Sequence, residues 1–154
     1  MSTLRDKVDD FLGQKRIGVA GVTRSAQNTA DFIYNKFRGA GYNVIPINPN
    51  AETYDGQTCY PDVKSVPGGI DGVVLVTRPD VTLQVVKDCA EAGVKRVWMH
   101  RSFGEGSVSE EAAAFCQANG ISVIAGACPM MYLEPDIGHS CLRFILGVTG
   151  GLPK

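Results

Sequence analysis

Short apolar runs alternate with amphipathic stretches along most of this chain, and this alternation limits its fold more than any other feature. Five runs have the composition of buried strands, at residues 17–20, 42–48, 72–77, 95–99 and 121–124. Between them apolar residues recur at helical spacing, and glycines mark where helices end. Strand and helix in turn, without a sequence repeat, are typical of a parallel sheet covered on both faces. We therefore predict an α/β, Rossmann-like, doubly wound parallel sheet of about five strands.

Helix boundaries are marked by capping residues. An N-terminal helix is predicted from Leu4 to Leu12, with Ser2 or Thr3 as its cap and Gly13 as its end. Ser107 and Glu110 have the spacing of a capping box for a later helix. Residues 51–69 are expected to form a loop with one short turn at 61–65. Asp136 is expected to cap a last helix, whose apolar stripe consists of Ile137, Cys141, Phe144, Ile145 and Val148.

Composition excludes several classes of protein. The 154 residues are expected to form a single domain, 1–154, and 44% of them are hydrophobic, which argues against disorder. With 15 Lys and Arg against 16 Asp and Glu, no broad basic surface is available for nucleic acid or an anionic membrane. No apolar run approaches the roughly 20 residues of a membrane span, so we expect a soluble, cytoplasmic protein. The five cysteines include no CxxC pair, which argues against a disulfide framework and a zinc site.

The first strand leads into a loop that has the features of an anion site. This loop contains Gly21, Val22, Thr23, Arg24 and Ser25, and Asn28 and Thr29 follow at the start of a helix. Backbone amides at a helix N-terminus attract phosphate, and the polar side chains add donors. The pattern is not GxGxxG, and the second strand ends in Asn48 where a dinucleotide site has Asp or Glu, so NAD is disfavoured. No GK[ST] follows, so it is not a P-loop.

Other candidate residues follow the remaining strands, because ligands of open parallel sheets lie at the strands' carboxyl ends. Asn48 either shapes the turn around Pro49 or contacts a ligand. Arg78, held extended by Pro79, is either an anion contact or a solvated arginine. His100 has no carboxylate at a recognisable spacing, which disfavours general-base catalysis. Cys128 is either a reactive loop thiol or a small buried residue, whereas Cys89, Cys116 and Cys141 are expected to be inert core residues.

The chain resembles a known family from Arg16 to about Tyr132. The resemblance lies in IGVAGVTRS, GYNVIPINPN, YDGQTCYPDVKSVP, the RPD at 78–80, VKRVWMH and ACPMM. It is to the small single-domain CoA-binding proteins, whose fold is similar to the N-terminal domain of the succinyl-CoA synthetase alpha subunit. The family often has a basic residue directly after its Asn-Pro, able to meet the 3'-phosphate of CoA, whereas this chain has Asn50. The ligase activity of the larger relatives does not transfer, because it needs domains that this chain lacks.

The resemblance implies that CoA lies across the strand ends. Its diphosphate would rest on the amides of residues 21–25, with Asn48 and Pro49 near the adenosine. Thr77, Arg78 and Pro79 would flank the adenine or the diphosphate, and His100 and Cys128 would lie nearer the pantetheine arm. We therefore expect a protein that binds CoA or an acyl-CoA without evident catalysis, as a possible homo-oligomer. The alternatives are an NAD(P)-dependent oxidoreductase, a thiol-active protein that uses Cys128, and a ligand-sensing partner protein.

Overall fold

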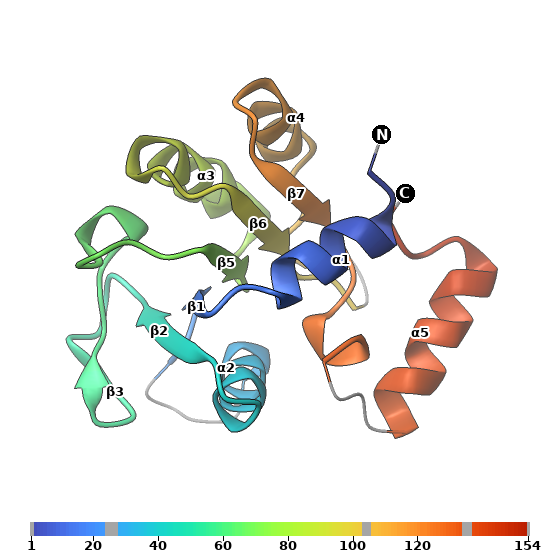
Figure 1. The fold of residues 1–154 in the computed structure, drawn as a ribbon, viewed down its shortest axis with the longest axis horizontal. Coiled ribbons are helices and arrows are strands. Elements are labelled where there is room, and N and C mark those ends of the chain that lie inside the picture. Colours follow the sequence, from blue (N-terminus) through green and yellow to red (C-terminus); the bar gives the residue numbers. More distant parts are fainter. Residues whose placement is uncertain (1, 24–27, 103–105, 134–136, 154) are drawn as a thin grey trace.

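A five-stranded parallel sheet forms the centre of the molecule (Figure 1). The structure, a computed structural model, describes residues 2–23, 28–102, 106–133 and 137–153. The strand order is β2 (Asn43–Ile47), β1 (Arg16–Ala20), β5 (Gly72–Leu75), β6 (Arg96–Met99) and β7 (Ser122–Ala125). All four pairings are parallel, so the predicted α/β sheet is confirmed.

The strand order reverses at β1. From β1 the chain first adds β2 on one side and then returns to place β5 on the other side, where Ile17 is paired with Gly72. In doubly wound sheets a crevice opens at such a reversal, beyond the carboxyl ends of the two strands. The fold therefore directs attention to the residues that follow Ala20 and Leu75.

Helices cover both faces of the sheet (Figure 1). Alternate strand residues belong to the two core clusters, one on each face. On one face lie α1 (Leu4–Leu12) and α2 (Thr29–Gly39), over Ile17, Val19 and Val44. On the other lie α3 (Pro79–Ala92) and α4 (Glu110–Ala118), over Val73, Leu75 and Val97. Of the 22 residues in these five strands 17 are buried, which explains why the strands read as apolar runs.

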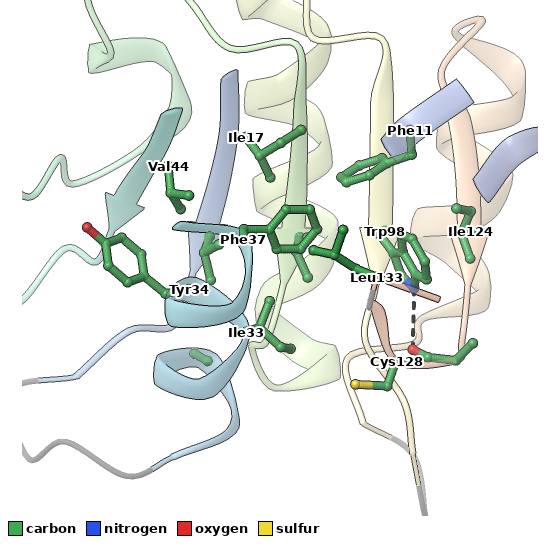
Figure 2. Close-up of a cluster of buried hydrophobic side chains, with 14 of the residues drawn as sticks. Phe11, Ile17, Ile33, Tyr34, Phe37, Val44, Trp98, Ile124, Cys128 and Leu133 are labelled. Carbon is green, nitrogen blue, oxygen red and sulfur yellow. Dashed lines mark hydrogen bonds between the residues drawn. The ribbon is translucent and has the colours of Figure 1, made fainter. Parts of the chain in front are cut away.

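The core beneath α1 is centred on Trp98 (Figure 2). Its ring meets Phe11 edge to face at 5.4 Å between centroids. The indole Nε1 donates to the carbonyl of Gly126 at 3.0 Å and to that of Ala127 at 3.3 Å. Burial of this large side chain with its polar atom satisfied fixes the residues beyond β7 against the sheet.

Residues 51–69 contain more structure than the sequence predicts. The short turn η1 (Val63–Ser65) falls within the predicted range. Before it, however, β3 (Thr53–Tyr54) and β4 (Gln57–Thr58) pair as an antiparallel hairpin that was not predicted. Two-residue strands leave no periodic pattern, and tertiary contacts hold this hairpin, since the Tyr54 ring packs against Tyr34 of α2 at 4.8 Å between centroids.

The predicted cap of α4 is wrong by two residues. α4 is capped by Ser109, whose side chain accepts from the amide of Ala112. Ser107 is instead buried, and its Oγ accepts from the amide of Thr77 at 2.9 Å. Ser107 therefore joins the segment before α4 to Thr77 and does not cap the helix.

The last helix, α5 (Ile137–Thr149), forms where it was predicted but presents a different face to the core. Leu142 and Leu146 pack against the body through η2 (Pro129–Met131), while Phe144, Ile145 and Val148 are exposed. These three residues of the predicted stripe therefore point outward, and its Cys141 is exposed, which corrects the expectation of a core cysteine. Asp136 lies outside the described residues. Over the described ranges, no helix has the length and apolarity needed to span a membrane.

Candidate functional site

The loop after β1 begins at a position that only glycine fits. Gly21 has a φ of +108°, and a Cβ there would lie 2.2 Å from the carbonyl oxygen of Val76. Its amide donates to Ile47 O at 3.1 Å, and Val76 N donates to Ala20 O at 2.9 Å. β1 is thus clamped between the two neighbouring chain segments as it ends, and the following Val22 turns into the core.

The far end of this loop is tied back to its beginning. Asn28 caps α2, and its Nδ2 donates to the Gly21 carbonyl at 3.3 Å and to Thr23 Oγ1 at 3.1 Å. Thr29 is exposed on the first turn of the helix. Arg24 and Ser25 lie between these two ends, outside the described residues, so their predicted contacts with an anion stay predictions.

Asp31 holds the loop from below, and sequence reasoning missed it. Its carboxylate accepts from the amides of Thr23 and Asn28, both at 3.2 Å, and from the hydroxyl of Tyr54 at 2.8 Å. Burial, together with this bond to Asp31, raises the pKa of Tyr54, so the phenol stays protonated. The Thr23 amide is therefore engaged within the protein. The spacing of Asn28 and Asp31 is that of a capping box and was visible in the sequence.

A cavity of about 250 Å³ opens at the strand reversal, and we call it the switch-point cavity. Its floor is the end of β1, and its sides are the end of β2, the segment before η1 and the first turns of α3. Most of the lining is apolar. The lining residues are Ala20, Gly21, Ile47, Asn48, Pro49, Pro61, Asp62, Val63, Thr77, Val81, Gln84, Val85 and Asp88.

Four of the predicted site residues meet at this cavity: Gly21, Asn48, Pro49 and Thr77. The Asn48 side chain also builds the turn, because Nδ2 donates to Val22 O at 2.5 Å and Oδ1 accepts from the amide of Asn50 at 2.7 Å. The amide of Thr77 donates a hydrogen bond to Ser107 Oγ, and Thr77 Oγ1 lies 3.3 Å from Thr82 Oγ1. These bonds fix the cavity rim without a ligand.

Arg78 and Pro79 start α3 beside the cavity but do not line it. Pro79 occupies the first helical position, where its missing N–H costs nothing. The Arg78 side chain is 79% exposed and its Nη2 lies 2.9 Å from Asp80 Oδ2. The guanidinium therefore stands in solvent with a local partner. Val81 and Val85, one and two turns into the helix, present the apolar wall.

His100 and Cys128 lie elsewhere, at the β6 and β7 end of the sheet. His100 is 8% exposed, its amide donates to Leu75 O at 2.9 Å, and its Nε2 lies 3.2 Å from Ser102 Oγ. Burial, with a smaller effect of His139, lowers the pKa of His100 to about 4, so the ring is neutral at pH 7. Cys128 is fully buried in the Trp98 core (Figure 2). Neither residue lines the switch-point cavity.

Two carboxylates at the cavity were also missed. Asp62 Oδ1 accepts from the amide of Ser65 at 2.8 Å and from its hydroxyl at 2.9 Å, as the cap of η1. Asp88 Oδ1 lies 3.0 Å from Gln84 Nε2 and 3.3 Å from Lys64 Nζ. Asp62 had a readable capping position, whereas nothing in the sequence indicates that Asp88 turns toward the same space.

Comparison with known proteins connects this arrangement to a family. A family model described as a CoA binding domain matches residues 15–134. The chain is 28% identical over 114 residues to the uncharacterized protein YneT of Bacillus subtilis, covering 74% of this chain and 82% of that protein. A solved structure of a hypothetical protein from Pyrococcus horikoshii superposes with a TM-score of 0.77 at 26% identity, over 86% of this chain and 93% of the other.

A larger relative matches through one of its parts. The alpha subunit of the ADP-forming acetate–CoA ligase II of Pyrococcus furiosus is 28% identical over 105 residues, which is 68% of this chain but 23% of that subunit. The segment matched by the family model includes every part of the switch-point cavity and ends before α5.

Proposed function

This chain belongs to the CoA-binding domain family, and we propose that it binds CoA or an acyl-CoA with the adenosine end in the switch-point cavity. The observation that carries the proposal is the cavity itself. It lies at the reversal of strand order, at the carboxyl ends of β1 and β5, where doubly wound sheets bind nucleotides. CoA, when bound, supplies a thiol that carries acyl groups as thioesters.

The residues present fit the adenosine part of this ligand. Val81, Val85 and Ile47 offer an apolar wall, and an adenine ring gains most from such contact. Gln84 and Thr77 supply a few polar groups in the same lining, and these would fix the orientation of a base or sugar. The glycine at position 21 lets the main chain pass at the cavity floor without a side chain.

We assign the diphosphate to the loop between Gly21 and Asn28. Two amides of the expected phosphate site already donate hydrogen bonds within the protein. Gly21 N donates to Ile47 O, and Thr23 N donates to Asp31. The proposal therefore gives the anion contacts to Arg24, Ser25 and the start of α2, where the helix dipole favours negative charge. Asp31 and Asn28 act as positioning residues that hold the two ends of this loop.

The pantetheine arm is proposed to run along the strand ends toward β6 and β7. His100 and Cys128 are buried there, so in this proposal they support the surface under the arm and do not react with it. A neutral His100 with Ser102 beside it offers hydrogen bonds and no charge. No catalytic step is part of the proposal.

Titration calorimetry with CoA tests the proposal, with a pair of variants on the same helix. Val81→Trp places an indole in the mouth of the cavity, where the 39% exposure of Val81 lets the fold accept it. We expect CoA affinity to fall at least about tenfold, or about 1.4 kcal/mol. Lys87→Trp, on the exposed side of α3, is the control and should bind as the wild type does. Equal affinity in both variants, or no binding by the wild type, would refute the proposal.

A further inference from the structure

The charged groups that line the switch-point cavity are all acidic. Asp62 and Asp88 contribute carboxylates, and the described lining includes no lysine or arginine. The hydrogen bonds resolved for Asp62 both come from Ser65, which is neutral. They therefore do not compensate the negative charge of Asp62. A ligand that enters the cavity therefore meets hydrogen-bond acceptors with negative charge.

The ammonium that contacts the cavity lining at Asp88 is shared with a second carboxylate. Lys64 Nζ lies 3.3 Å from Asp88 Oδ1 and also 3.3 Å from Glu91 Oε2. Hydrogen bonds from its ammonium to Asp88 and Glu91 raise the pKa of this lysine. Of the two carboxylates that line the cavity, Asp88 therefore shares an ammonium with Glu91, whereas the bonds of Asp62 to Ser65 bring it no positive charge.

A second hollow adjoins the cavity and has the same character. We call it the adjoining groove; it is lined by residues 49–52 and 58–61 and shares Pro49 and Pro61 with the cavity. Its charged lining residue is Glu52. Arg38 of α2 is paired with Asp55 of the hairpin, and neither residue lines this groove. Over the described residues, neither hollow offers a free guanidinium or ammonium to an anion.

This charge pattern separates two kinds of nucleotide end. A phosphate on the ribose carries between −1.5 and −2 charges and requires cationic or N–H donors. A ribose with free hydroxyls, or an adenine amino group, donates hydrogen bonds, and carboxylates accept them. Carboxylates beside a sugar therefore select the unphosphorylated form, as the acidic residue does in dinucleotide sites.

We infer that the switch-point cavity takes the adenosine end of an ADP-containing ligand with an unphosphorylated ribose, and that it binds dephospho-CoA at least as tightly as CoA. The inference rests on the proposed function, because it assumes that the cavity holds an adenosine. It adds the ligand class, which is an adenosine diphosphate derivative. It also implies that the 3'-phosphate of CoA contributes no affinity.

Parallel titrations with CoA and dephospho-CoA test the inference. For the wild type we expect a Kd for dephospho-CoA equal to or below that for CoA. Asp62→Asn keeps an oxygen for the η1 cap but removes the charge, and should raise the affinity for CoA relative to that for dephospho-CoA about threefold. Asp9→Asn, an exposed aspartate on α1 that pairs with Arg5 away from the cavity, is the matched control and should change neither.

The outcomes of these titrations are distinct. CoA binding more than tenfold tighter than dephospho-CoA would overturn the inference and leave the proposed function standing. If the preference for CoA disappears in Arg24→Ala, that arginine supplies the 3'-phosphate contact, and the inference is equally overturned. Binding of neither ligand would remove the proposed function and the inference with it. A further variant, Asn50→Lys, adds an ammonium to the adjoining groove and should favour CoA over dephospho-CoA about tenfold.

Discussion

At the carboxyl ends of the strands, the chain takes a different course on the β2, β1 and β5 side of the sheet than on the β6 and β7 side. Beyond β1, β2 and β5 the chain turns away and leaves the switch-point cavity. Beyond β6 and β7 the two segments stay hydrogen bonded two residues past the strand ends, because Arg101 N donates to Ala127 O at 2.9 Å. Trp98 lies beneath this segment (Figure 2), and its Nε1 donates to the carbonyls of Gly126 and Ala127. We call the two regions the open end and the closed end.

The difference shows that a parallel sheet supplies a place for a ligand but not the room for it. Room at the open end comes from glycine at position 21 and from valines at the start of α3. At the closed end Trp98 and the buried Cys128 fill the core on the face of the sheet that α1 and α2 cover. Function is therefore expected to depend on the open end, and stability mainly on the closed end.

Emptying the closed end should have the largest effect on stability. Trp98→Ala removes a fully buried ring and its hydrogen bonds, and should lower the free energy of unfolding by about 4 kcal/mol. Urea denaturation measures this loss. Phe144→Ala, an equally drastic truncation at a side chain 72% exposed, should cost less than about 0.5 kcal/mol. Similar losses in the two variants would show that the closed end is not a packed core.

Acid should weaken the closed end through His100. Its pKa is about 4 in the folded protein against an ordinary 6.5, so the unfolded chain binds the additional proton between these values. The stabilisation is complete above about pH 6.5 and is lost as the pH falls toward 4, by about 3 kcal/mol. His100→Gln should lack this part of the pH dependence. Parallel pH profiles of unfolding free energy for both proteins would refute the assignment.

Substitution at the open end should cost stability through the backbone. Gly21→Ala forces a Cβ against the Val76 carbonyl, whereas Gly41→Ala, also at positive φ, meets no atom within 4 Å. Left-handed backbone costs either alanine about 1 kcal/mol, and the steric clash should add about 2 kcal/mol at Gly21 alone. Thermal or urea unfolding of the two variants measures the difference. Equal losses would mean that the main-chain approach at Gly21 is not tight.

Sequence patterns predicted the buried strands best. The run at Gly72–Leu75 is apolar because both faces of β5 are covered, and such burial can be predicted without a structure. The last helix was found by its periodicity, but its inward face was not, because Leu142 and Leu146 alternate with Phe144 and Ile145 in a helix that is apolar almost all round.

The open end was predicted in outline and missed in detail. Gly21, Asn48, Pro49 and Thr77 follow strands directly, so topology alone brings them to one edge. Asp88 reaches the cavity from the third turn of α3, and this contact depends on helix rotation, which spacing does not determine. Asp31 reaches the first loop from the first turn of α2, where its capping-box spacing with Asn28 was visible in the sequence but its bond to Thr23 was not. The hairpin that presents Tyr54 to Asp31 is likewise too short to leave a pattern.

Mapping amide chemical shifts during a CoA titration tests the proposed binding site most directly. We predict that the largest changes occur at the open end, at the amides of Gly21, Thr77 and Val85, with small changes at residues 128–132 and none along the outer face of α5. If the largest changes occurred at residues 100–102 and 128–132 while the three cavity amides did not move, the ligand would bind at the closed end and the proposed site would be contradicted.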